Sequence, residues 1–75
     1  MTYPVKLRSV KDVRKLNEIA SKQDFPMYVS DKNGTVFVDA RSLLALFALV
    51  GRNINLVAPD HVSADDFLKV VRSLG

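Results

Sequence analysis

Cysteine and tryptophan are absent from the 75 residues of this chain, and His61 is its only histidine. Without cysteine the protein forms no disulfide, carries no thiolate nucleophile and offers no cysteine ligands for zinc or an iron–sulfur cluster. One histidine cannot provide a multi-histidine metal site. We therefore expect no metal ion and no other cofactor. No Ser-His-Asp set, glycine-rich phosphate loop or perturbed carboxylate pair stands out either, so an enzyme is not expected.

Long apolar runs are also missing. The longest uncharged run, residues 42–51, is too short to span a bilayer, and residues 1–11 lack the apolar core of a signal peptide. With the lack of cysteine, this predicts a cytoplasmic protein that does not enter a membrane. Hydrophobic residues make up 48% and charged residues 25%, a balance typical of a folded domain rather than a disordered chain. The length allows one small domain, residues 1–75.

Acidic side chains are scarce in the first part of the chain. The net charge is +3, and residues 1–22 alone hold six basic and two acidic side chains. Two interpretations are open: the excess forms a solvated helix surface, or it meets an acidic partner or a polyanion.

Hydrophobic periodicity predicts seven elements. Alternation indicates strands, and spacings of three and four residues indicate helices with one apolar face. Ser9 with Asp12, and Ser63 with Asp66, form capping boxes that begin the first and last helices. Asp39 is expected to cap the middle helix, which Gly51 ends. The predicted strands cover residues 3–8, 25–30, 35–38 and 53–58, and the predicted helices cover 10–22, 40–50 and 64–74.

Asn33-Gly34 predicts a hairpin with a type I′ turn, in which both central residues have positive φ. That turn pairs Ser30 with Phe37 and Val29 with Val38. The resulting fold class is an α+β open-faced two-layer sandwich of order β-α-β-β-α-β-α, with a four-stranded antiparallel sheet and three helices on one face. The open face is expected to carry Lys6, Arg8, Tyr28, Ser30, Phe37, Asn53 and Asn55.

The middle helix is unusual because residues 43–50 are apolar all round. A helix on one sheet buries only about half of its circumference, so part of this helix stays exposed or is covered by a partner. Leu44 and Phe47 are the main candidates for such contact. The alternatives are that both belong to the core, or that they are buried in a homodimer formed through this helix.

The order, length and residue pattern resemble the HPr phosphocarrier family of the bacterial sugar phosphotransferase system. The similarity is best from Ala20 onward. It lies in the end of the first helix at residues 20–22, the hairpin at 27–38, the second helix at 39–49 and the acidic start of the last helix at 62–67. The resemblance implies the open-faced fold and a role in phosphotransfer or its regulation.

The chain departs from that family at the phosphoryl acceptor. The family has a histidine at the start of the first helix, an arginine two residues later and then a proline; here Ser9, Lys11 and Asp12 match these positions. A serine phosphate is too stable an ester for a reversible relay, and Asp12 would repel a phosphoryl group. Ser9 and Lys11 are therefore a degenerate acceptor position. His61 lies in a turn where the family has no acceptor.

The resemblance also implies a regulatory phosphorylation site and a partner surface. Ser42 matches a serine that a kinase phosphorylates in part of the family, and a phosphate in the first turn of a helix is electrostatically favoured. An ordinary helix-start serine is the alternative. The implied partner surface is apolar at its centre and basic around it, which fits an acidic protein. It comprises Leu44, Phe47 and Ala48 with Arg41, Lys11, Arg14 and Lys15.

Three functions remain open at this point. The first is an HPr-like interaction or regulatory module that has lost its acceptor. The alternative is a small RNA-binding domain, because residues 34–38 are similar to an RNP1 motif, and Tyr28 and Phe37 can share the open face for base stacking. The third, a true phosphocarrier or enzyme, lacks the residues its chemistry needs.

Overall fold

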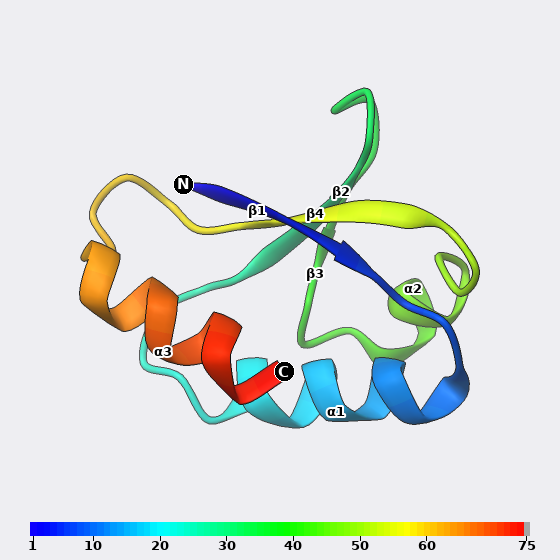
Figure 1. Cartoon of the computed structure of the whole chain (residues 1–75), viewed down its shortest axis with the longest axis horizontal. Coiled ribbons are helices and arrows are strands. Elements are labelled where there is room, and N and C mark those ends of the chain that lie inside the picture. Colours follow the sequence, from blue (N-terminus) through cyan, green and yellow to red (C-terminus); the bar gives the residue numbers. More distant parts are fainter. Residues whose placement is uncertain (75) are drawn as a thin grey trace.

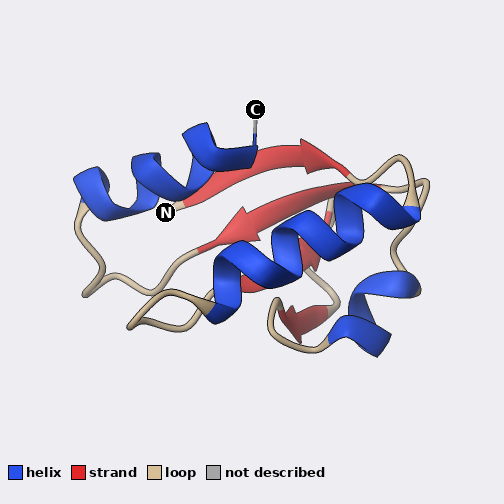
Figure 2. Ribbon diagram, turned by 90° about the horizontal axis from the view of Figure 1, so that it is seen from below, coloured by secondary structure: helices blue, strands red, loops and turns tan. Residues whose placement is uncertain are grey.

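The computed structural model describes residues 1–74. Within them the four strands form one antiparallel sheet of order β1-β4-β2-β3, and three helices lie on one face of it (Figures 1 and 2). The predicted α+β open-faced two-layer sandwich is confirmed. The elements are β1 (Thr2–Lys6), α1 (Val10–Ser21), β2 (Tyr28–Asp31), β3 (Phe37–Asp39), α2 (Leu43–Phe47), β4 (Asn53–Val57) and α3 (Ala64–Leu74).

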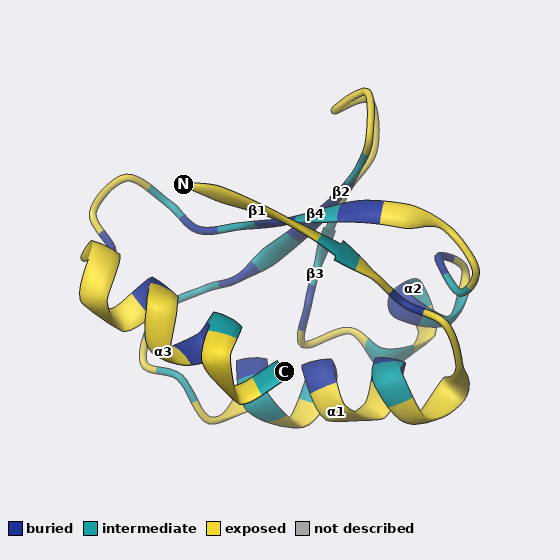
Figure 3. Cartoon of the chain, in the orientation of Figure 1, coloured by how far each residue is buried: buried dark blue, intermediate teal, exposed yellow. Residues whose placement is uncertain are grey.

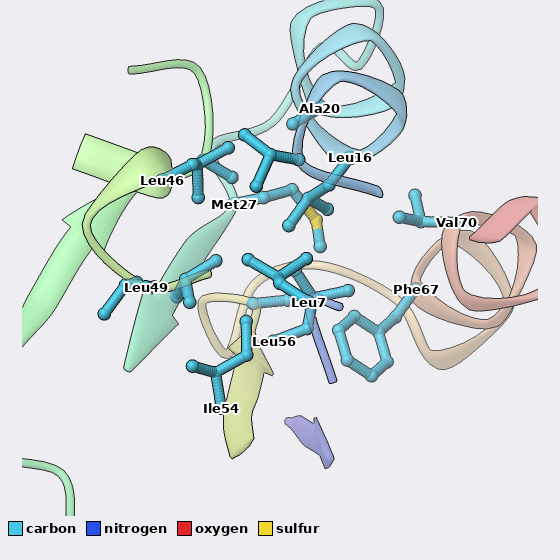
Figure 4. Packing of buried hydrophobic residues seen from close by; sticks show 14 of the residues in the cluster. Leu7, Leu16, Ala20, Met27, Leu46, Leu49, Ile54, Leu56, Phe67 and Val70 are labelled. Atoms are coloured by element: carbon cyan, nitrogen blue, oxygen red, sulfur yellow. The ribbon is translucent and has the colours of Figure 1, made fainter. Parts of the chain in front are cut away.

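The core lies between the sheet and the helices, where each element contributes its apolar face (Figure 4). Ile54 and Leu56 of the central strand β4 are 2% and 0% exposed. Buried residues recur on α1 and α3 at helical spacing, and their outer sides are exposed (Figure 3). The inward residues of these two helices are Val13, Leu16 and Ala20 on α1 and Phe67 and Val70 on α3.

Both serine caps form as predicted. The Ser9 hydroxyl accepts a hydrogen bond from the Asp12 N–H at 3.4 Å, and the Ser63 hydroxyl accepts from the Asp66 N–H at 3.1 Å. The Asp12 carboxylate then accepts from the backbone N–H of Arg8, at 2.9 Å, one residue before the cap itself. The two serine bonds satisfy N–H groups that the first turn of a helix leaves free.

The β2–β3 hairpin has the predicted register but not the predicted turn. Val29 pairs with Val38 and Ser30 with Phe37. The turn closes one residue earlier, where the Gly34 N–H donates to the Asp31 carbonyl at 3.1 Å, and within this turn only Gly34 has positive φ. The Asp31 carboxylate explains the change, because it accepts from the N–H groups of Thr35 and Val36 and so organises a longer loop.

The prediction of a helix over 40–50 capped by Asp39 is wrong. Helix α2 has five residues, and Ser42 is its N-cap. Asp39 remains in β3 opposite Tyr28, and the N–H of Ala40 still donates to the Met27 carbonyl at 2.9 Å. Because the sheet holds this backbone, helical geometry begins only after Ser42.

Not all of the residues predicted on the open face of the sheet are exposed. Lys6, Phe37 and Asn53 are exposed, and Tyr28 and Asn55 are partly buried. Ser30 is only 3% exposed, because a small side chain in the middle of a sheet lies below its neighbours. Arg8 is exposed but lies beyond the end of β1, so it belongs to the connection to α1 and not to this face.

Candidate functional site

Helix α2 carries one strongly exposed apolar residue. Leu44 is 83% exposed, whereas Leu46, two positions later, is completely buried. Ala48, four positions after Leu44 and so on the same side of the helix, is also exposed. Phe47 is partly buried and packs against the core. We call Leu44, Phe47 and Ala48 the α2 patch. Two of its side chains are exposed, and the third, Phe47, is partly buried.

Main-chain and side-chain hydrogen bonds hold the α2 patch in place. Before the helix, the Asn17 side chain of α1 donates to the Ala40 carbonyl at 3.2 Å. The Ser42 hydroxyl accepts from the Ala45 N–H at 3.4 Å. After the helix, the Gly51 N–H donates to the Leu7 carbonyl at 2.6 Å, and Gly51 has a φ of +85°. Figures 1 and 2 agree that α2 lies beside the N-terminal half of α1, with which it packs.

The predicted basic residues of α1 do not all lie toward α2. Asn17 faces the α2 side, and Arg14, three positions earlier, is exposed on the adjacent part of the helix surface. Lys11 is exposed near the helix start. Lys15 lines one hollow with Lys11 and Arg14, and it also lines a second hollow with Leu74 of α3. Of these three residues, Lys15 is thus the one that also borders α3.

Arg41 forms an ion pair instead of standing free beside the α2 patch. Its guanidinium Nε lies 3.3 Å from a carboxylate oxygen of Asp39. The backbone N–H of Arg41 donates to the same carboxylate, and this bond, followed by those of the side chain, holds the pKa of Asp39 below its ordinary value. The carboxylate therefore stays ionised and offsets much of the charge that Arg41 would offer a partner.

The degenerate acceptor position is a helix cap. Ser9 is exposed, and its hydroxyl oxygen is engaged with the Asp12 N–H. His61 is exposed in a turn closed by the Val62 N–H and the Pro59 carbonyl, which are 3.0 Å apart. The connection that holds this turn lies at the opposite end of the molecule from the start of α1 (Figure 1). The structure does not bring the one histidine to the position where the family has its acceptor.

No family model and no curated protein matches the chain. Within residues 1–74, no helix combines the length and apolarity needed to cross a membrane. In the same residues, the acidic and histidine side chains do not gather into a group of three that could hold a metal ion.

Sequence reasoning missed two features of the exposed surface. Val10 is apolar but 50% exposed, because it begins α1, where the core does not yet reach. Lys32 lines a hollow on the sheet face together with Lys6 and Asn53. The sequence did not place Lys32 here, because only the pairing of β2 with β4 shows that Lys32 follows along β2 toward Asn53.

Proposed function

We propose that this chain is a protein-interaction module that docks a partner through the α2 patch. The observation that carries the proposal is the 83% exposure of Leu44 on a helix held at both ends. Burying a leucine side chain stabilises a complex by about 1.5–3 kcal/mol relative to leaving it in water. An isolated exposed leucine is ordinary, but Leu44 is joined on its own side of the helix by exposed Ala48 and partly buried Phe47.

The partner we propose is an acidic protein. The chain carries a net charge of +3, and the excess lies in residues 1–22, which include the helix packed against α2. Lys11 and Arg14 are exposed on that helix and have no acidic partner within ion-pair distance in the described residues. Such rim charges raise the rate of association with a negatively charged surface and disfavour basic competitors.

A relation to the HPr-like proteins forms part of the proposal, as a divergent member that no longer carries phosphohistidine. The element order β-α-β-β-α-β-α supports it, together with the apolar helix after the hairpin. The absence of a histidine from residues 1–60 supports the loss of the relay, because a reversible carrier needs an imidazole nitrogen.

Affinity capture from the native host, followed by measured binding of the partner it recovers, tests the docking surface. The test variant is Leu44→Asp with Ala48→Asp, because both side chains are exposed and Phe47, which supports the core, is left intact. The control is Leu68→Asp, at a leucine of α3 that is 40% exposed. We expect the α2 variant to lose the partner and the control to keep it.

Two results would overturn this proposal. If both variants retain the partner equally, docking does not use the α2 patch. If sedimentation shows that the wild type forms a dimer that Leu44→Asp dissociates, the patch is occupied by a second copy, and an acidic partner is not needed to explain its exposure.

Phosphorylation of Ser42 is proposed as the switch on this surface. Its hydroxyl lies two residues before Leu44, so a phosphate would place a dianion beside the apolar patch. Ser42→Asp adds charge and Ser42→Asn does not, while both residues are good N-caps. We expect only Ser42→Asp to weaken partner binding; equal effects of the two would count against regulation by charge.

A further inference from the structure

The open face of the sheet, on the side away from the helices, arranges its side chains in three rows across the strands. The pairing of β1, β4 and β2 puts Lys6 opposite Asn53, with Lys32 following next along β2. The second row runs from Pro4 through Asn55 and Ser30 to Phe37, and the third ends with Tyr28 beside Asp39. Rows lie about 7 Å apart and neighbouring strands about 4.8 Å apart. We call the residues Lys6, Lys32, Phe37, Asn53 and Asn55 the sheet face.

Positive and negative side chains of this face lie in different rows. Both lysines are exposed and line a shallow hollow of about 380 Å³ with the two asparagines. The nearest acidic group of β2, Asp31, directs its carboxylate to the hairpin loop, where it accepts from Thr35 and Val36. Asp39 lies in the far row and is paired with Arg41. A ligand that crosses the hollow therefore meets positive charge and amides, and its complement is an anion.

An aromatic ring lies on the same face beyond the hollow, separated from Asn55 by Ser30 of β2. Phe37 is 59% exposed on the edge strand β3, in the same row as Asn55. Leaving a phenylalanine side chain in water forgoes a stabilisation of about 1.5–3 kcal/mol that burial would give. Tyr28, partly buried, lies one row further along β2. Lysines and amides are enough to bind a small anion. An aromatic ring on the same face therefore indicates a larger ligand that also has a flat apolar part.

We infer that the sheet face binds single-stranded nucleic acid. Phe37 stacks on an unpaired base, the amides of Asn53 and Asn55 hydrogen-bond to base edges, and Lys6 and Lys32 contact phosphates. Aromatic side chains on an open sheet recognise unpaired bases, because bases within a duplex are already stacked on each other. Backbone contact by lysines and stacking by rings are also the two components of binding that tolerates many sequences. This surface lies on the opposite side of the sheet from the α2 patch, and the inference does not depend on docking there.

The experiment is a binding titration of the whole chain with fluorescently labelled oligonucleotides of about eight nucleotides, one arm with RNA and one with DNA. Binding is followed from about 50 to about 200 mM salt. We expect binding to weaken with salt in both arms. Tighter binding of RNA would assign a contact to the 2′-hydroxyl, and equal binding would assign recognition to stacking and phosphates alone; each supports the inference.

Two sets of variants separate this site from general attraction to a basic protein. A plot of log affinity against log salt has a negative slope, to which each phosphate contact to a single strand contributes about 0.7. Replacing Lys6 and Lys32 by glutamine should therefore make this slope shallower by about 1.4. The control replaces Lys22 and Lys69, two exposed lysines on the helical side, and should leave that slope unchanged.

Phe37→Ala and Phe37→Leu test the ring. Both should weaken binding about fivefold or more, whereas Phe37→Tyr should retain it, because only the ring stacks on a base. Phe37→Leu keeps an apolar side chain on β3, so its effect cannot be attributed to loss of the strand; circular dichroism checks the fold. Leu44→Ala, on α2, should have no effect.

Four results would overturn the inference. These are no binding in either arm at the lowest salt, unchanged binding by both Phe37→Ala and Phe37→Leu, equal loss of salt slope in the control lysine pair, and equally tight binding of a polyglutamate peptide, which has charge without bases. If the oligonucleotides fail to bind while a protein partner still requires Leu44, only this inference falls and the proposed docking function stands.

Discussion

Leu44 and Leu46, two leucines of the same short helix, provide a direct test of how α2 is oriented. Leu46 is completely buried and lies in the same cluster as Met27 and Leu16, whereas Leu44 is 83% exposed (Figure 4). Replacing a fully buried leucine by alanine typically costs 2–5 kcal/mol, of which part is the cavity left behind. A chain of this length has a free energy of unfolding of roughly 4–11 kcal/mol. We therefore expect Leu46→Ala to remove a large share of the stability.

Leu44→Ala should change the free energy of unfolding by no more than about 0.5 kcal/mol, because the side chain has little to lose. For a domain of this size each kcal/mol shifts Tm by about 4–8 °C, so the two variants should melt at least roughly 6 °C apart. Far-UV circular dichroism in urea and on heating measures both, since tryptophan is absent. Similar losses for the two variants would refute the orientation of α2 and with it the α2 patch.

Gly51→Ala should cost about 1–2 kcal/mol, because φ is +85° and an added Cβ would meet no atom within 4 Å, so that the backbone alone accounts for the loss; an unchanged urea midpoint would contradict this. Ser63→Ala should cost about 1 kcal/mol of unfolding free energy through loss of the α3 cap, whereas Ser73→Ala, within the same helix, should be nearly neutral, and equal losses would argue against capping. The Thr35 hydroxyl and nearby N–H groups hold the pKa of Asp31 below its ordinary value of 3.8. The ionised carboxylate therefore stabilises the fold fully above about pH 4, and this stabilisation is lost as the pH falls through the lowered pKa. Asp31→Asn should therefore flatten the acid side of a plot of unfolding free energy against pH, and a curve parallel to that of the wild type would exclude the contribution.

The hairpin separates what a local pattern predicts from what it leaves open. The register of Val29 with Val38 could be read from the alternation of apolar residues, because a shift by one residue would turn every side chain to the wrong face. The turn type could not be read in this way. Asn33-Gly34 favours a two-residue turn, but the Asp31 carboxylate competes for the N–H groups of the loop and stabilises a longer one.

The candidate residues divide in a similar manner. The basic character of α1 follows from the sequence, but which of its basic residues also borders α3, namely Lys15, depends on where α3 packs against the helix. The sequence also did not predict the pairing of Arg41 with Asp39, because this pairing requires Asp39 to stay in the sheet. The packing of the elements decides which of these charges remain available to a partner.

Periodicity in the sequence determined the element order, the two serine caps and the inward faces of α1 and α3, because on those helices polar residues mark the side that water contacts. For α2 the buried side cannot be predicted in this way, because every residue from Leu43 to Val50 is apolar and no polar residue marks the side that water contacts. Tertiary structure made that choice. The sheet retains the backbone as far as Ala40, the bond from Gly51 to Leu7 fixes where the following turn must end, and between these two points the helix can direct Leu46 inward only by leaving Leu44 in water.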